Sequence, residues 1–479
     1  MNENDSEERA RGHIRKLIWL YFWLLLIEGA LRKWVLPEYS IPLLVIRDPV
    51  ALAIYFLSFR ARVFPWNAWV VVLVVLGCLD TMATYSQLWD YVPPLHITAV
   101  TVYGIHSNFF HLPLVFVIGR VLTIEDVKRI GWWTLLLIVP MAMLMVVQFR
   151  SPADSFVNRA AGGEGEVLMS SMDKVRTAGP FSFVIGVVAY FSMATGYLVW
   201  GMLTRGVYPR WLLGIAGAAL IIGTSVSGSR SVVGACGVVV ASLLLVVILR
   251  PRIVNRFGQI LLAVVVLGFV VSRTPIFREG AKVLSTRFSE VAEATEQSIQ
   301  MDLLSRSVST FYDAWKVLAV APGLGWGLGV GTNAGAKLLV GQSGFLLMEG
   351  EWPRIIMENG PVLGLAYLLW RFAFVMRIAW LTIRSVLMDN LLPLLLFASS
   401  GLPLLNGQFG QPTILGFAVF VTGLAVAAMS GDEVASSEEQ PPGGNPKTSL
   451  KPVRGRSAYA ERLHGAGVTP ERTNGSVAG

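Results

Sequence analysis

The sequence predicts an all-α integral membrane protein of about twelve transmembrane helices, with a large periplasmic loop between the ninth and tenth helices. Hydrophobic residues make up 54% of the 479 residues and charged residues 15%, whereas about a quarter of a soluble chain is charged. Apolar runs close to the roughly 20 residues that cross a bilayer recur along the chain. Unbroken apolar runs favour helices over the alternating strands of a membrane barrel.

The spans are expected where the apolar runs lie. Their ranges are 17–34, 41–58, 66–85, 97–119, 130–148, 180–203, 210–226, 231–249, 257–272, 357–376, 390–406 and 413–430. The chain therefore divides into an N-terminal segment 1–16, a membrane domain 17–430 and a C-terminal segment 431–479. The last segment is polar and rich in Pro, Gly and Ser, which is typical of a disordered tail.

Orientation follows from the lysines and arginines of the short loops, because cytoplasmic loops carry the excess of positive charge. With the N-terminus inside, these residues favour the cytoplasmic side by about two to one. Both termini are then cytoplasmic in a bacterial inner membrane. Segments of about 149–179 and 273–356 lie outside as loops. Within the second, 283–318 has helical periodicity and is expected to form an amphipathic helix on the membrane surface.

Composition excludes several classes. The two cysteines, Cys78 and Cys236, lie inside apolar runs, so no disulfide framework is implied. The net charge of +8 is explained by loop residues that orient the helices and calls for no nucleic-acid partner. The first apolar run follows the charged segment RARGHIRK without a clear cleavage site, which indicates a retained helix. No cofactor is expected.

Ionisable groups at membrane depth are costly, so each is a candidate functional residue. Near the outer ends of the expected helices they suggest a polar chamber that is open to the periplasm and roofed by the large loop. The members of this set are Glu28, Arg32, Lys33, Arg47, Asp48, Asp80, Arg176, Arg230, Arg306, Glu349, Glu351, Arg354 and Glu358.

Three arginines are candidate ligands of a diphosphate. Arg230 follows Ser229 in SVSGSRS, and a guanidinium fork with hydroxyl donors suits a phosphate. Arg176 lies in VRTAGPFS just before the sixth expected helix, where a helix N-terminus also attracts anions. Arg306 belongs to the amphipathic loop segment. The alternatives are a headgroup contact for Arg230, an ordinary loop position for Arg176 and a solvated helix face for Arg306.

Candidate general bases cluster in the segment MEGEWPRIIMENG. A buried carboxylate here can remove a proton from an acceptor, which makes Glu349, Glu351 and Glu358 the catalytic candidates. Arg354 is a supporting residue. The alternative is a capping or ion-pairing role for the same carboxylates.

Other polar residues favour structural roles or none. Arg47 and Asp48 are expected to form a local pair that fixes the second helix, with Asp48 in a supporting role. His106 and His111 are five residues apart, which is poor spacing for one face of an α-helix, so no metal-ligand cluster and no catalytic metal are expected. GLGWGLGVG follows no strand, which excludes a dinucleotide loop and leaves a loop with close backbone approaches.

Four motifs in order resemble a known family. They are RTAGPFS before the sixth helix, SGSRS opening the eighth, the outer loop leading through Trp315 to PGLGWGLG, and ENGPVLGLAYLLW running into the tenth helix. In this order, over about 170–375, the chain resembles the bacterial O-antigen ligase and O-antigen polymerase membrane proteins. The N-terminal stretch EGALRKWVLP…IRDPVALAIY lies outside the general pattern of that family.

The resemblance implies a metal-independent membrane glycosyltransferase whose donor is a glycan on undecaprenyl diphosphate. Arginines would hold the departing diphosphate, and a base would activate a sugar hydroxyl. The ligases of the family carry an outer-loop histidine, and this chain has none between His111 and His464. A polymerase is therefore expected, with membrane lipid and other polysaccharide-assembly proteins as partners. The alternatives are a ligase that transfers glycan to a lipid or protein, and a non-enzymatic polysaccharide transporter.

Overall fold

The computed structural model describes residues 3–162, 169–251, 258, 265–295, 310–342 and 344–438. The chain separates into Met1–Val434 and Ala435–Gly479, and the architecture below is that of the first unit. No β-strand occurs in the described ranges, where Met169 and Val175 form only an isolated antiparallel bridge. The all-helical prediction is confirmed.

The helices follow the apolar runs. In chain order they are α1 Glu3–Ala30, η1 Leu31–Val35, η2 Pro37–Tyr39, η3 Pro42–Val45, α2 Asp48–Arg60, α3 Ala68–Leu88, α4 Pro94–Ile105, η4 His106–Phe110, α5 Leu114–Val121, α6 Ile124–Arg150, η5 Phe156–Asn158, α7 Val184–Leu203, α8 Arg210–Val226, α9 Arg230–Leu249, α11 Pro275–Thr295, α13 Asn333–Val340, α14 Glu351–Leu387, α15 Leu392–Asn406 and α16 Pro412–Glu438. Every expected span except 257–272 overlaps at least one of them, but 41–58 is divided between η3 and α2, and 97–119 among α4, η4 and α5. The span 257–272 lies mostly outside the described residues.

Seven helices within the described ranges are long and apolar enough to cross a membrane, and an eighth is added if the bent pair α4–η4 and α5 is one span. The expected number of about twelve is not reached by this test. The shortfall has a physical reason at two expected spans, because α8 and α15 are apolar but shorter than a full crossing. The length and apolar composition of these helices indicate a membrane-embedded protein.

Two helices form the centre of the bundle. In α7, 94% of the apolar window is buried, and in α16 83% is buried, whereas the window of α9 is only 22% buried. A helix that is apolar on every side belongs in the interior, and one with exposed apolar faces suits lipid contact. α7 packs against α9 and α15, and α14 packs against α15 and α3.

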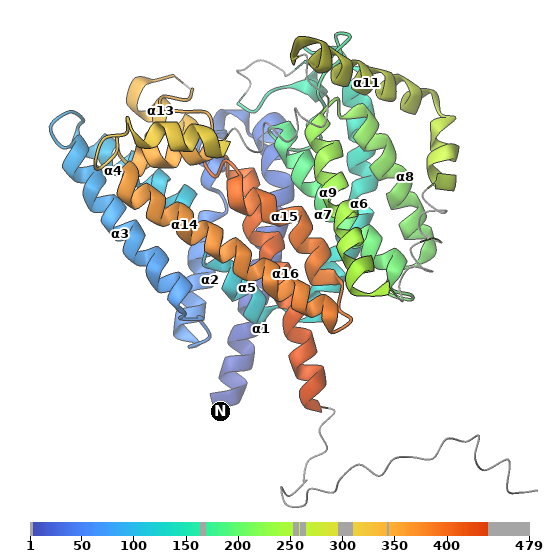
Figure 1. The fold of residues 1–479 in the computed structure, drawn as a ribbon, viewed down its shortest axis with the longest axis horizontal. Coiled ribbons are helices and arrows are strands. Elements are labelled where there is room, and N and C mark those ends of the chain that lie inside the picture. Colours follow the sequence, from blue (N-terminus) through green and yellow to red (C-terminus); the bar gives the residue numbers. More distant parts are fainter. Residues whose placement is uncertain are drawn as a thin grey trace, which may run out of the picture. The chain divides into compact units, whose positions relative to one another are not determined.

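The loop elements gather at one end of the unit. α11, which packs against α8, and α13, which packs against α4, lie at the end opposite the N-terminus of α1 (Figure 1). α11 covers part of the amphipathic segment 283–318, and the described residues 310–318 are also helical. α16 extends through 431–438, so the helix enters the segment expected as a tail, and 439–479 lies outside the described residues.

Local sequence explains the helix boundaries that matter for the site. Thr123 and Asp126 form a capping box at the start of α6, in which each side chain accepts from the backbone N–H of the other. Asn67 caps α3 by accepting from the Val70 N–H. α14 is kinked at Gly360, which has a φ of 77° and is followed by Pro361. This kink places the first two turns of α14 apart from its long apolar part.

Candidate active site

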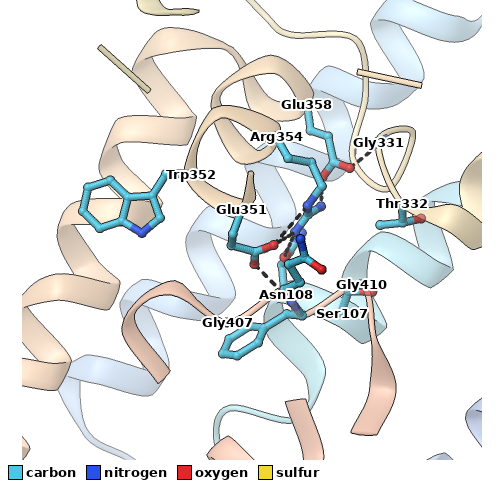
Figure 2. Close-up of polar contacts among 12 residues, drawn as sticks. Ser107, Asn108, Gly331, Thr332, Glu351, Trp352, Arg354, Glu358, Gly407 and Gly410 are labelled. Carbon is cyan, nitrogen blue, oxygen red and sulfur yellow. Dashed lines mark hydrogen bonds and ion pairs between the residues drawn. The ribbon is translucent and has the colours of Figure 1, made fainter. Parts of the chain in front are cut away.

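A buried ion-pair network lies at the start of α14. Arg354 Nη1 is 2.6 Å from Glu358 Oε2, and Arg354 Nη2 is 3.0 Å from Glu351 Oε2. Arg371, about three helical turns beyond the kink, pairs with Glu351 Oε1 at 2.9 Å. Glu351, Arg354 and Glu358 meet because residues three, four and seven apart share one face of a helix, as Figure 2 shows.

Backbone groups complete the network. Glu358 Oε1 accepts the N–H of Gly331 at 2.8 Å, and Glu351 Oε1 accepts that of Phe409 at 3.3 Å. Arg354 also donates to Asn108 Oδ1 at 3.3 Å (Figure 2). Charges removed from water are stable only when paired and hydrogen-bonded, and here both conditions hold. Glu351 and Glu358 therefore position Arg354 through direct contacts.

The third predicted carboxylate has different surroundings. Glu349 is exposed and lines a small cavity together with Glu351 and Arg354. Gln408 donates to the Glu349 carbonyl at 2.8 Å and lines the same cavity. The general-base role of the three carboxylates stays a prediction, and of the three Glu349 is the one open to solvent.

The glycine-rich loop fits against the kink of α14. Pro361 has no N–H, so the Met357 carbonyl lacks its usual helical donor, and Trp326 supplies one at 2.8 Å. The next carbonyl, that of Glu358, accepts the N–H of Gly327 at 2.9 Å. A Cβ on Gly325, where φ is +75°, would lie 2.1 Å from this carbonyl oxygen. The predicted close backbone approach is confirmed, and its partner is the opened helix.

Arg176 lies beside the turn between α8 and α9, here called the arginine turn, and Arg230 directly follows this turn. Gly228 has a φ of +59°, and a Cβ built there would lie 3.8 Å from Arg176 Cγ. Ser170 and Thr177 donate to the carbonyls of Gly228 and Val226, which fastens the Arg176 segment to this turn. Arg230 is the first residue of α9 and follows its N-cap residue Ser229.

The guanidinium of Arg176 has a buried hydrogen-bond donor. Its Nε has no hydrogen-bond partner in the described part of the chain, although the atom is buried. Such an unpaired buried donor is costly, and an anion would satisfy it. α11 covers this region, since Gly280 packs on the Ser225 carbonyl and Lys174 pairs with Glu279 at 2.7 Å. Arg306 lies outside the described residues.

The N-terminal stretch forms a third cluster, which lies between the other two. Glu28 Oε2 is 3.1 Å from Arg47 Nε, and Arg32 Nη1 is 3.6 Å from Glu28 Oε1. Arg32 donates to Ser182 Oγ at 3.1 Å, and Lys33 Nζ to the carbonyls of Gly179 and Phe181 at 3.2 and 3.4 Å. These contacts hold the segment that follows Arg176.

The expected local pair of Arg47 and Asp48 is wrong. Arg47 pairs with Glu28, and Asp48 instead contacts His106 Nδ1 at 2.7 Å and His111 Nε2 at 3.0 Å. The expectation that the spacing of the two histidines excludes a metal-ligand cluster is wrong as well. η4 is a π-helix, in which residues five apart lie on one face, so the two rings meet around one carboxylate. Their ligand atoms lie within 4.8 Å of one another and of Asp48.

No family model and no curated protein sequence matches this chain. The geometry therefore carries the functional argument by itself. Tyr103, three residues before His106, donates its hydroxyl to the Gly410 carbonyl at 3.0 Å, and Gly410 lines the cavity beside Arg354. Through Tyr103 on one side and Lys33 on the other, the N-terminal cluster joins the α14 network to the arginine turn.

Proposed function

We propose that the chain is a metal-independent glycosyltransferase that polymerises undecaprenyl-diphosphate-linked glycan units at the periplasmic face of the inner membrane. The observation that carries the proposal is the buried, unpartnered Arg176 Nε beside the turn that carries Ser229 and Arg230. A diphosphate leaving group becomes more negative as its bond to the sugar breaks. Fixed guanidinium groups stabilise that charge without having to reorganise.

Several further features support the proposal. The dipole of α9 favours an anion at the N-terminus of this helix. Only 22% of the apolar window of α9 is buried, so a lipid-linked donor can approach this helix from the bilayer. The Glu351–Arg354–Glu358 network lies at the other end of the N-terminal cluster, next to the exposed Glu349.

The test is glycan polymerisation by the purified protein in lipid nanodiscs, with undecaprenyl-diphosphate-linked repeat units as the substrate. We expect Arg230→Ala and Arg176→Gln each to lower turnover by about 100- to 1000-fold, which is the usual effect of removing one fixed donor to developing charge. Arg210→Ala is the matched control, because Arg210 is exposed at the start of α8, at the far end of that helix from the turn. Normal polymer from the Arg176 and Arg230 variants would contradict the proposal.

The anchor of the product separates polymerase from ligase. Polymer that remains on undecaprenyl diphosphate supports the proposed polymerase. Glycan joined to a lipid or protein acceptor supports the ligase alternative, in which the same arginines would serve the donor.

A further inference from the structure

Asp48, His106 and His111 form a buried cluster that the α14 network and the arginine turn do not use. Asp48 is the first residue of α2, His106 begins η4, and His111 directly follows η4. Both histidines are almost fully buried, at 4% and 1% exposed, while the Asp48 side chain keeps 22% of its surface exposed. The cluster is thus closed on the histidine side and open at the carboxylate.

Hydrogen bonding fixes where the protons lie. Arg47 can only donate, and it donates to the Tyr21 hydroxyl oxygen at 3.1 Å. The Tyr21 hydroxyl then donates its own proton to His111 Nδ1, 3.2 Å away. His111 Nε2 therefore carries a proton and donates it to Asp48 Oδ1.

One nitrogen is left over. Asp48 Oδ2 accepts the Nδ1–H of His106 at 2.7 Å, so the Nε2 of a neutral His106 is a bare acceptor. That Nε2 is buried and has no partner in the described ranges. A carboxylate on one imidazole nitrogen and a vacant lone pair on the other is the arrangement of a histidine base oriented by an acid.

The charges of the surroundings favour a proton over a metal ion. Arg47 and Arg32 face the cluster from one side, against the carboxylates of Glu28 and Asp48, while Tyr103 and His111 add no charge when neutral. A divalent ion would add two positive charges beside the buried Arg47 and would have to displace the protons that both imidazoles direct at Asp48. One transferred proton adds a single charge next to a carboxylate.

We propose that His106, oriented by Asp48, accepts the proton of the acceptor sugar hydroxyl during glycan transfer; this rests on the proposed function. The hydroxyl oxygen forms a bond to the anomeric carbon of the donor glycan, and the bond from that carbon to the diphosphate oxygen breaks. The electron pair leaves with undecaprenyl diphosphate, and the hydroxyl proton passes to His106 Nε2 and from there to water. Because Nε2 is buried in this structure, the packing around the ring has to open for the acceptor to reach it.

The location of His106 fits this step. Arg32, in the same cluster as Glu28, donates to Ser182, six residues after Arg176, so the cluster adjoins the segment that carries the diphosphate ligand. On its other side, Tyr103 contacts Gly410 at the cavity. Side-chain contacts thus connect the histidine cluster to the segment after Arg176, and Tyr103 of α4, the helix that leads into η4, reaches the cavity.

The test compares His106→Gln with His96→Gln in the nanodisc assay, because His96 is an exposed histidine on α4, the helix that leads into η4. We expect His106→Gln to lower the maximal rate by about 100-fold or more while the KM for the lipid donor stays unchanged. His96→Gln should match the wild type. His106→Ala should be partly restored by added imidazole, which a purely structural histidine would not be. Asp48→Asn should lower the rate with a normal donor KM.

Each contrary result has a distinct meaning. Wild-type turnover in His106→Gln, or loss in Glu349→Gln alone, overturns the His106 assignment and leaves the glycosyltransferase standing. A His106→Ala protein that binds undecaprenyl diphosphate but gains nothing from imidazole also overturns it. Absence of glycan transfer by the wild-type protein removes the proposed function and this inference together.

Discussion

Lys33 Nζ donates to the Gly179 carbonyl across 146 residues of sequence, at 3.2 Å. Lys33 lies in η1, which directly follows α1, and Gly179 lies three residues after Arg176. Gln148 holds the same glycine by donating to its carbonyl and accepting its N–H, at 3.0 and 2.8 Å. The N-terminal stretch therefore fixes the loop that presents the candidate diphosphate ligand.

Lys33→Met tests this contact. The methionine keeps a long side chain but donates no hydrogen bond. The Phe181 carbonyl then loses the Lys33 donor, and the Gly179 carbonyl keeps only the hydrogen bond from Gln148 among those described. We expect a loss of about 1–3 kcal/mol in the free energy of unfolding, with weaker donor binding because the Arg176 segment is released. Thermal unfolding in detergent measures the first and native mass spectrometry the second. Lys128→Met is the control, since the Lys128 side chain pairs with the exposed Glu125.

Arg354→Met tests the α14 network. Removing the guanidinium leaves the buried Glu358 without its ion-pair partner and Glu351 with Arg371 alone, and breaking a buried pair typically costs about 3–5 kcal/mol. We expect a large drop in thermal stability and in the amount of protein recovered from membranes. Arg377→Met, at an exposed position of the same helix, should leave both unchanged. Equal stability of the two variants would refute the network's role.

Gly325→Ala tests the contact between the glycine loop and the kink. The new Cβ would sit 2.1 Å from the Glu358 carbonyl oxygen, at a backbone φ of +75° that L-residues rarely adopt. We expect destabilisation of about 2 kcal/mol or more. Gly323→Ala is the matched control from the same loop, because nothing lies within 4 Å of its Cβ and its φ is not positive. Melting temperatures of the two variants give the comparison.

The helices could be predicted from the sequence because their signal is local. Apolar runs locate the helices but not their ends: α6 begins at Ile124, six residues before the expected span, and α14 continues to Leu387, eleven residues beyond it. Membrane depth also marked Glu28, Arg47 and Arg354 as unusual. The number of crossings was harder, since α8 and α15 are apolar but short, and runs of similar hydropathy do not reveal their length in the fold.

The partners of the site residues could not be predicted, because they depend on irregular backbone. The two histidines share a face only in a π-helix, which spacing rules for an α-helix exclude. Arg371 was missed although it is an arginine inside an apolar run, a signal that membrane depth provides. The pairing of Asp48 with histidines instead of Arg47 depends on α1, which brings Glu28 to Arg47.

Binding of undecaprenyl diphosphate without any sugar is the sharpest test of Arg176 as a ligand of the diphosphate. Native mass spectrometry or titration in nanodiscs compares the wild type, Arg176→Gln and the control Arg210→Gln. We expect the wild type and Arg210→Gln to bind undecaprenyl diphosphate alike, and Arg176→Gln to bind it about tenfold or more weakly. The reason is that a hydrogen bond to a charged group contributes about 1.5–3 kcal/mol. Equal binding by all three proteins would contradict this expectation.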